Sequence, residues 1–454
     1  MKQILSIALL LIVGITVSAQ EAENNWHQFR GPTGNGVSAN ATPPISWKPA
    51  DAKWKTEIPG SGLSSPVVWN DKIIMLTSVK TDRVKEGAEA APAQEETRPD
   101  QGRGGRGGRG GRRGRRQSPP PSNYHDFFVV CVSRDDGSEL WKTKVNSEVP
   151  HESHHGTNSF ASGSPVTDGS HIWASFSSFG VFCLDMDGKV VWDRQLGKMK
   201  TRNSFGEGAS PAVHGDTLVV NWDHEGQSFI EAMNAKTGKT IWKKDRDEQT
   251  SWSTPVIVEH DGKVQVITNG AKRVRSYNLA NGDVIWECGG QTGNPIPTPM
   301  VIDDMAVCMT GFRQNAAMGI PLSSEGDITD SEQVVWSRRD IGPYVPTGVL
   351  YKGTVYSTKG SDAILTAIDA KTGDTVIKAT RLSGIRSLYS SMVAANDHIY
   401  VTGRNGMTLV LKHGDKLDIV ASNDLGEEVD ATPAIVDNQI FIRGHQNLYC
   451  FEKQ

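Results

Sequence analysis

A five-residue segment of the chain has the residue types and the spacing of a zinc protease site. Residues 151–155 read His-Glu-Ser-His-His and contain the pattern His-Glu-x-x-His, in which one helical turn must place both imidazoles on the same side of a metal. A proline precedes the segment, a glycine follows it and no amphipathic run continues it, so we expect a loop. The expected role is that of polar loop residues, and the alternative is a loop metal site formed by His151, His154 and His155.

A second segment, residues 102–107, has the glycine spacing of a dinucleotide-binding loop. That loop binds phosphates only between a strand and a helix, whereas the whole segment 80–125 is of low complexity and predicts a disordered insertion. Residues 101–125 contain seven Arg and no acidic residue, and without them the net charge of −4 would be −11. We therefore expect residues 101–117, which we call the Arg-Gly arm, to bind acidic polymers.

The elements that must position these segments recur along the chain. Eight times a short apolar strand opens with a Ser-Pro or Thr-Pro pair, or a degenerate form of it. The copies begin at Ser65, Ser164, Ser210, Thr254, Thr298, Thr347, Ser391 and Thr432. From the second copy onward the spacings are 46, 44, 44, 49, 44 and 41 residues, a period typical of a propeller blade. The sequence predicts an all-β, eight-bladed β-propeller of four-stranded antiparallel blades.

A Trp recurs on the outermost strand of five blades, where a large ring could cover the gap to the next blade. These residues are Trp141, Trp192, Trp242, Trp286 and Trp336. The eighth copy ends after Phe451 without a fourth strand, whereas residues 45–56 have the composition of one. Because a closed ring leaves no exposed sheet edge, we expect this N-terminal strand to close the propeller, which would span residues 45–454 after an N-terminal extension, residues 20–44.

The Trp-bearing repeats resemble those of the pyrroloquinoline-quinone (PQQ) type, or quinoprotein-like, β-propeller family. The phrases that carry the resemblance are Trp-His-Gln-Phe-Arg-Gly-Pro (26–32), Ser-Pro-Val-Thr-Asp-Gly (164–169), Ser-Trp-Ser-Thr-Pro (251–255) and Gly-Asp-Ile-Thr-Asp-Ser (326–331). Nearly the whole mature chain is similar to an uncharacterised secreted bacterial branch, related to the propeller of the outer-membrane assembly lipoprotein. The resemblance implies a fold and a branch but no defined activity.

The loops predict which face of the ring carries function. The A-to-B and C-to-D turns of each blade are short, whereas the B-to-C and D-to-A connections contain the irregular segments, in which we include residues 312–331. Long loops on a rigid scaffold are where binding residues concentrate. The candidates on this loop-rich face are Arg202, Asp223, Arg246, Trp252, Arg273, Arg313, Tyr344, Arg386, Tyr389 and Arg404, with the histidines of residues 151–155.

The N-terminus and the cysteines indicate where the chain works. Residues 1–19 have the basic start, the apolar core and the small-residue cleavage site of a secretory signal peptide. No later stretch approaches the roughly 18 apolar residues of a membrane span, so we expect a periplasmic or secreted protein without a transmembrane segment. Three cysteines, Cys131, Cys183 and Cys450, occupy a small-residue strand position on sheets too far apart for a disulfide, and pairing of Cys288 with Cys308 stays open.

Three classes of function fit these observations. The first is a non-catalytic binding or assembly propeller of the cell envelope, which recognises a partner protein or ligand through the loop-rich face and needs no cofactor. The second is a PQQ- and Ca²⁺-dependent quinoprotein dehydrogenase, which rests on the fold resemblance because the chain lacks adjacent cysteines and a convincing Glu/Asn/Asp set. The third is a polyanion-binding surface protein that acts through the Arg-Gly arm. We expect the first.

Overall fold

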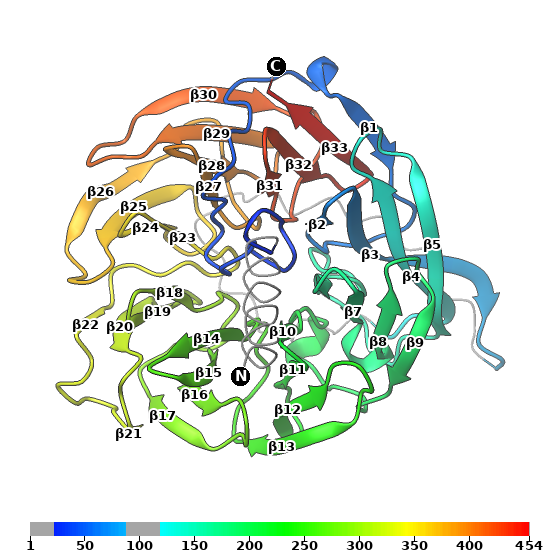
Figure 1. The fold of residues 1–454 in the computed structure, drawn as a ribbon, viewed down its shortest axis with the longest axis horizontal. Helices are drawn as coiled ribbons and strands as arrows, with labels where there is room; N and C mark the ends of the chain where they lie inside the picture. Colours follow the sequence, from blue (N-terminus) through cyan, green and yellow to red (C-terminus); the bar gives the residue numbers. More distant parts are fainter. Residues whose placement is uncertain (1–21, 88–118, 454) are drawn as a thin grey trace, which may run out of the picture.

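The computed structural model describes residues 22–87 and 119–453, and these form an eight-bladed β-propeller. Figure 1 shows the blades arranged in a ring around a central axis, which we call the channel. We name the strands of each blade A to D from the channel outward. Pairing within every blade is antiparallel, as predicted, because each strand is joined to the next by a turn.

The first four blades follow one another along the chain. Blade one contains β2 (Val67–Trp69), β3 (Lys72–Val84), β4 (Asn123–Ser133) and β5 (Glu139–Glu148). Blade two contains β6 (Val166–Thr167), β7 (His171–Ser175), β8 (Val181–Asp185) and β9 (Val190–Arg194). Blade three contains β10 (Ala212–His214), β11 (Thr217–Trp222), β12 (Ser228–Asn234) and β13 (Thr240–Arg246). Blade four contains β14 (Val256–His260), β15 (Lys263–Thr268), β16 (Val274–Asn278) and β17 (Val284–Cys288).

The remaining blades complete the ring. Blade five contains β18 (Met300–Ile302), β19 (Met305–Thr310), β20 (Ala316–Pro321) and β22 (Trp336–Arg338). Blade six contains β23 (Val349–Tyr351), β24 (Thr354–Thr358), β25 (Ile364–Asp369) and β26 (Thr375–Arg381). Blade seven contains β27 (Val393–Ala395), β28 (His398–Thr402), β29 (Met407–Lys412) and β30 (Ile419–Asp424). Blade eight contains β31 (Ala434–Val436), β32 (Gln439–Arg443) and β33 (Asn447–Glu452), with β1 (Trp54–Glu57) as its fourth strand.

The ring is closed by the N-terminal strand, as the sequence predicts. Strand β1 pairs antiparallel with β33, with Trp54 opposite Cys450. The paired strand is shorter than the predicted residues 45–56, because Pro49–Asp51 form a turn of 3-10 helix before it. Trp47, ahead of that turn, stacks on Phe451 with ring centroids 5.2 Å apart. Trp47 therefore covers blade eight by packing, ahead of the paired strand.

The recurring Ser and Thr residues at the start of each copy form a ring of hydrogen bonds around the channel. In seven of eight steps the backbone N–H donates to the hydroxyl of the equivalent residue in the next blade, at 2.9 to 3.1 Å. The missing step lies between blades four and five, where the hydroxyl of Thr298 is buried without a hydrogen-bond partner among the described residues. The motif recurs because each blade needs a short hydroxyl at this position to accept from its neighbour.

The Trp residues of strand D join the outer parts of adjacent blades. The indole Nε1 donates to the carbonyl of the residue that follows strand C of the next blade, at 2.7 to 3.1 Å. This contact is made by Trp54, Trp141, Trp192, Trp242 and Trp336. Trp286 is the exception: its Nε1 is buried without a partner in the described chain, and the equivalent carbonyl, of Leu322, accepts from Gln265 at 2.9 Å.

The interface between blades four and five is held instead by an insertion. Residues 322–335 join strands C and D of blade five, and within them β21 (Gly326–Asp327) pairs parallel with β17 of blade four. The predicted insertion at 312–331 is therefore wrong in its position, because residues 316–320 are part of β20. The added residues begin on the short-turn face and run along the outer edge of blade four. Enlarged connections are thus not confined to the loop-rich face, contrary to the prediction.

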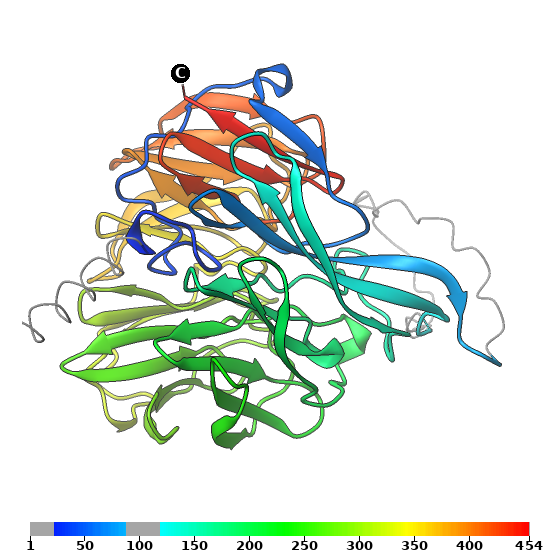
Figure 2. The same ribbon diagram turned by 45° about the vertical axis from the view of Figure 1, so that its right-hand side comes forward.

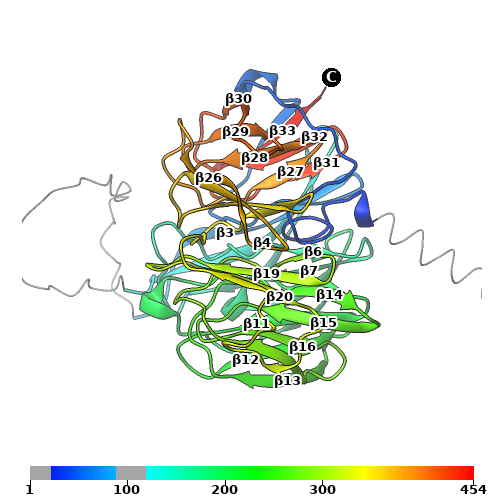
Figure 3. The ribbon, with the colours of Figure 1, turned by 90° about the vertical axis from the view of Figure 1, so that its left-hand side faces the viewer.

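Residues 22–44 cover the short-turn end of the channel (dark blue in the centre of Figure 1 and on the right in Figure 3). Trp26 forms an antiparallel bridge with Val68 of β2. Arg30 is fully buried, where its guanidinium donates to the carbonyl of Gly348 at 2.5 Å and burial lowers its pKa to about 9. The loop-rich end of the channel is the end that residues 22–44 leave uncovered.

Strands β3 and β4 project from the ring on the side away from residues 22–44 (Figure 2). Their pairing runs from Lys72 with Ser133 to Val84 with Asn123. The ends of segment 80–125 are therefore strand and not disordered, because main-chain pairing continues past the blade. Residues 88–118, which include the Arg-Gly arm, and the predicted signal peptide at 1–19 lie outside the described residues.

The five cysteines are buried and unpaired, including Cys288 and Cys308. Three of them lie opposite the Trp position of strand D, as in the pairs Cys131 with Trp141 and Cys183 with Trp192. Burial raises the pKa of the Cys131 and Cys183 thiols to about 12, which keeps them protonated. Across the described ranges, no helix has both the length and the apolar character needed to cross a membrane.

Candidate functional site

The B-to-C and D-to-A loops bring arginine and aromatic side chains together at the loop-rich end of the channel. We call this group the axial cluster: Arg202, Phe312, Arg313, Tyr344, Tyr389 and Arg404. The rings of Phe312 and Tyr344 lie 5.0 Å apart, and a Cβ added to Gly293 would lie 3.7 Å from Nη1 of Arg202. Burial raises the pKa of Tyr344, and Tyr389 and Arg202 are close enough to shift it further in opposite directions.

The cluster spans the channel. Thr157, from the loop between blades one and two, donates to the hydroxyl of Tyr389, between blades six and seven, at 3.4 Å. Asn294, between blades four and five, donates to the hydroxyl of Tyr344 at 3.5 Å. Loops from opposite sides of the ring therefore meet over the axis, and each phenol receives a hydrogen bond while its own proton stays available.

A chain of charged groups fixes Arg404. Its guanidinium bonds both oxygens of Asp430, at 2.6 and 3.0 Å, and lies over the ring of Tyr389 at 4.3 Å. Nε2 of His445 lies 3.1 Å from Oδ2 of Asp430, and this contact raises the pKa of His445 although burial opposes the charge. Arg404 is therefore held in place, and the ring of Tyr389 is covered on one side.

Three other arginines on this face are not held by partners. The guanidinium groups of Arg202, Arg313 and Arg386 make no hydrogen bond or ion pair with any residue of the described chain. Arg202 is half-buried, whereas Arg313 and Arg386 are exposed. Arg386 lies next to Ser387, whose carbonyl accepts from the backbone of Arg404. These charges are available to a ligand.

The backbone beneath the cluster is strained. Asn203, Ser204, Asn294 and Arg313 all have positive φ, between 53° and 63°, a region that costs free energy for residues other than glycine. Several other positive-φ residues, such as Asn70 and Asp437, lie in A-to-B hairpin turns, whose geometry requires it. Arg313 lies in the hairpin connection between β19 and β20, whereas Asn203, Ser204 and Asn294 lie in connections between blades. Positive φ at residues other than glycine is enriched at functional sites.

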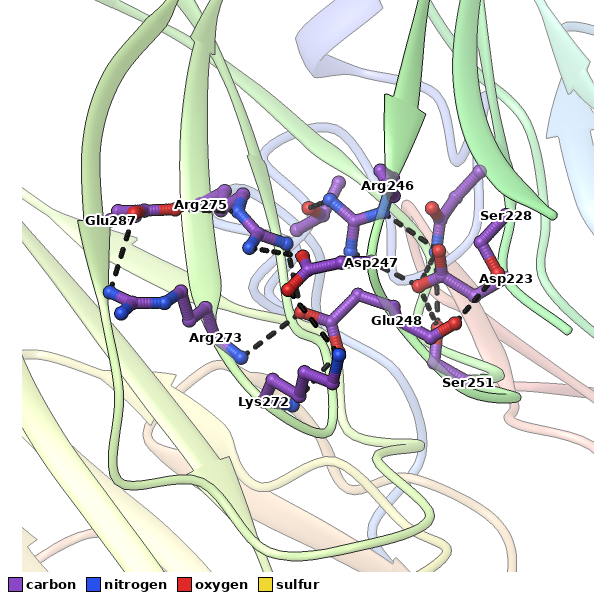
Figure 4. Close-up of polar contacts among 12 residues, drawn as sticks. Asp223, Ser228, Arg246, Asp247, Glu248, Ser251, Lys272, Arg273, Arg275 and Glu287 are labelled. Carbon is purple, nitrogen blue, oxygen red and sulfur yellow. Dashed lines mark hydrogen bonds and ion pairs between the residues drawn. The ribbon is translucent and has the colours of Figure 1, made fainter. Parts of the chain in front are cut away.

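Two predicted site residues, Asp223 and Arg246, are buried between blades three and four, where they bond each other (Figure 4). The guanidinium bonds the carboxylate at 2.7 and 3.1 Å and also donates to Tyr277 at 2.6 Å. Although burial opposes its charge, Asp223 and Tyr277 hold the pKa of Arg246 above its usual value. The two side chains bond each other and Tyr277, which joins two blades; that this pair also binds a ligand stays a prediction.

Arg273 belongs to a second ion network that also joins blades (Figure 4). Its guanidinium lies 3.3 Å from Glu287 and 2.8 Å from Asp327 of the blade-five insertion. Its neighbour Arg275 contacts Asp247, Glu248 and Glu287 at 2.6 to 2.8 Å. Sequence could not separate these arginines from those of the axial cluster, because only the positions of their acidic partners distinguish them.

The remaining candidates lie beside the cluster. Trp252 donates from Nε1 to the carbonyl of Gly206 at 2.7 Å, so it holds the loop that carries Arg202. His151 contacts the carbonyl of Met199 at 2.6 Å, and His154 contacts that of His155 at 2.8 Å. The three imidazoles of residues 151–155 thus have separate backbone and hydroxyl neighbours. Within residues 22–87 and 119–453, no group of three or more His, Cys, Asp or Glu is arranged to hold a metal.

A small cavity of about 20 Å³ lies beside His151, enclosed by loops of blades one to three. Glu207 lines it and accepts a hydrogen bond from the backbone of Ser178 at 2.9 Å, and burial raises the pKa of this carboxyl to about 7. The cavity has room for one water, whereas small-molecule sites usually measure hundreds of cubic ångströms. Two carboxylates of this face, those of Asp430 and Asp223, are bound to arginines.

Comparison with known proteins shows to which family the repeats belong. Residues 125–379 match the family model described as outer membrane protein assembly factor BamB. BamB of Yersinia pestis is 23% identical over 256 residues, which are 52% of this chain and 58% of that relative, so the match spans less than two thirds of it.

Two solved structures share the fold. BamB from Moraxella catarrhalis superposes with a TM-score of 0.51 and 14% identity, covering 72% of this chain and 94% of that one. The quinohemoprotein alcohol dehydrogenase from Comamonas testosteroni superposes with a TM-score of 0.61 and 10% identity, covering 97% and 82%. At these identities the likeness extends to the fold alone.

Proposed function

Because the chain belongs to the family of the outer membrane protein assembly factor BamB, we propose that it is a non-catalytic binding propeller of the bacterial cell envelope. It captures a partner protein through the axial cluster on the loop-rich face. The expected signal peptide and the name of the matched family both support a periplasmic location. Assembly in the envelope needs a rigid ring and one adaptable face, and the chain has both.

The observation that carries this proposal is the composition of the axial cluster. Arg and Tyr are enriched among residues that dominate binding energy at protein interfaces. Tyr344 and Tyr389 are partly buried, which limits the entropy lost when a partner orders them, and Arg202 is unpaired. The opposite end of the channel is covered by residues 22–44, so this face is the one that offers adaptable loops.

The test is capture of a partner from the envelope fraction of the native organism by the full-length protein. We expect the wild type to retain a specific protein, identified by mass spectrometry, and the double variant Tyr344→Ala with Tyr389→Ala to lose most of it, since each anchor contributes about 2 kcal/mol. The matched control is Lys236→Ala with Lys371→Ala, on the short-turn face. Equal capture by both double variants, with unchanged melting temperatures, would show that the partner binds elsewhere.

A further inference from the structure

The residues of the axial cluster also indicate the chemistry of the partner protein. The loop-rich face carries three guanidinium groups that make no hydrogen bond or ion pair within the described residues, those of Arg202, Arg313 and Arg386. The chain without the Arg-Gly arm has a negative net charge. Unpaired cations attract anions, and the guanidinium fork fits carboxylates and phosphates. The ligand of this face therefore carries negative charge.

The tyrosine hydroxyls specify what kind of group the ligand presents. Tyr344 and Tyr389 each accept a hydrogen bond, from Asn294 and Thr157 respectively, so each hydroxyl can still donate its own proton to a further acceptor. Burial raises the pKa of Tyr344, which keeps that phenol protonated. An ionised carboxylate is an acceptor without donors and matches both the hydroxyls and the guanidiniums.

The aromatic rings argue against a sugar. Flat stacking of a sugar needs an open ring face, but Arg404 covers Tyr389 at 4.3 Å and Arg313 lies over Phe312 at 5.1 Å. Phe312 and Tyr344 also cover each other, tilted by 36°. Each ring thus has at least one face occupied by a neighbouring side chain, which reduces the surface on which a sugar could stack, while the ring edges and hydroxyls suit the mixed side chains of a polypeptide.

The three free arginines come from different loops, and this argues against a compact phosphate. Arg202 lies between blades two and three, Arg313 within blade five and Arg386 between blades six and seven. A single phosphate needs donors that converge, whereas a segment with several acidic residues meets separate charges in turn. We propose that the axial cluster binds an acidic, carboxylate-rich segment of a polypeptide. This inference rests on the proposed function and names the chemistry of the partner.

The test measures binding of a fluorescent ten-residue poly-L-glutamate by anisotropy, at low and physiological salt. Because the Arg-Gly arm is itself expected to bind acidic polymers, wild type and variants are compared both as the full-length protein and without residues 101–117, and the comparison without the arm decides. The double variant Arg202→Gln with Arg313→Gln should bind at least tenfold more weakly, because it removes two charges and keeps side-chain length. The variant Tyr344→Phe with Tyr389→Phe should lose several-fold, since it keeps the rings and removes the donors. The control pair Lys236→Gln with Lys371→Gln should bind like the wild type in both comparisons.

Polygalacturonate and inorganic polyphosphate serve as competing probes. Preference for either over poly-L-glutamate, lost in the Arg202 and Arg313 double variant, would replace the peptide with a polysaccharide or a phosphate polymer. Equal binding of poly-L-glutamate by wild type and arginine variant would overturn the inference outright. If partner capture still depends on Tyr344 and Tyr389 in that case, the proposed function stands and only the acidic chemistry fails; if neither depends on the cluster, both fail.

Discussion

Two Trp residues at equivalent positions should differ in what their indole N–H contributes to stability. Trp336 donates to the carbonyl of Ala370 at 2.9 Å, whereas the Nε1 of Trp286, which is fully buried, has no partner among the described residues. Both rings pack between adjacent blades, so replacing each with Phe removes similar apolar volume. Only Trp336→Phe also breaks a hydrogen bond and leaves a buried carbonyl unpaired.

The expected difference follows from those two contributions. A lost hydrogen bond costs about 1 kcal/mol, and an unpaired buried acceptor up to about 3 kcal/mol. Trp286→Phe removes a buried donor that is already unpaired, which offsets part of its packing loss. We therefore expect Trp336→Phe to lower the free energy of unfolding by about 1–3 kcal/mol more than Trp286→Phe.

Urea denaturation of both variants, followed by far-ultraviolet circular dichroism, measures this difference. The slopes with denaturant should match that of the wild type, so that midpoints report stability. Should Trp286→Phe prove as destabilising as Trp336→Phe, or more so, then Trp286 has an acceptor that the structure does not show. The account of the interface between blades four and five would then be wrong.

Four further outcomes are expected. Thr298→Val should leave stability almost unchanged, because the hydroxyl of Thr298 has no hydrogen-bond partner among the described residues. Thr432→Val should destabilise the fold by about 1–3 kcal/mol, because the buried N–H of Ser391 loses its acceptor. Thermal unfolding of the two variants measures the difference. The pKa of the Glu207 carboxyl is raised from about 4.5 in the unfolded chain to about 7 in the folded one, so this group adds stability at pH values below 4.5 that is lost as pH rises through 7. Glu207→Gln should therefore flatten that part of the pH–stability curve, and an unchanged curve would contradict the raised pKa. Deleting residues 101–117 should abolish salt-sensitive binding to nucleic acid without shifting the melting temperature; binding that persists in the deletion would make the Arg-Gly arm a spacer. Adding PQQ with Ca²⁺ should produce neither a shifted quinone absorption band nor dye-linked alcohol oxidation, and saturable micromolar binding would reverse the ranking of functions.

Sequence alone determined the ring and its closure. A repeat that cannot bury its own faces requires neighbours, and both the spacing of the Ser and Thr positions and the missing outer strand of the last copy are visible without coordinates. The same pattern placed five Trp residues on strand D, and all five lie there. Local periodicity suffices for these features, since each blade solves the same packing problem.

The site was only partly within reach of sequence. Arg202, Arg313, Tyr344, Tyr389 and Arg404 were predicted and belong to the axial cluster, whereas Phe312 was missed because an isolated aromatic in a loop gives no signal. Arg246 and Arg202 are the same residue type and were assigned from sequence to the same class of connection, although Arg246 is the last residue of β13. One is buried against Asp223 and the other is unpaired, and this depends on which side chains the ring brings opposite each other.

The insertion of blade five shows the same division. The sequence indicates extra residues in blade five but not which turn they enlarge, because the bounds of β20 are set by its pairing with β19 and β22 in the sheet. Tertiary structure alone decided that β21 runs beside blade four and that Trp286 and Thr298 lose their usual bonds at the same interface. The repeat determined what each blade is made of; contacts between residues far apart in the chain determined which charges are paired inside the ring and which remain free at its mouth.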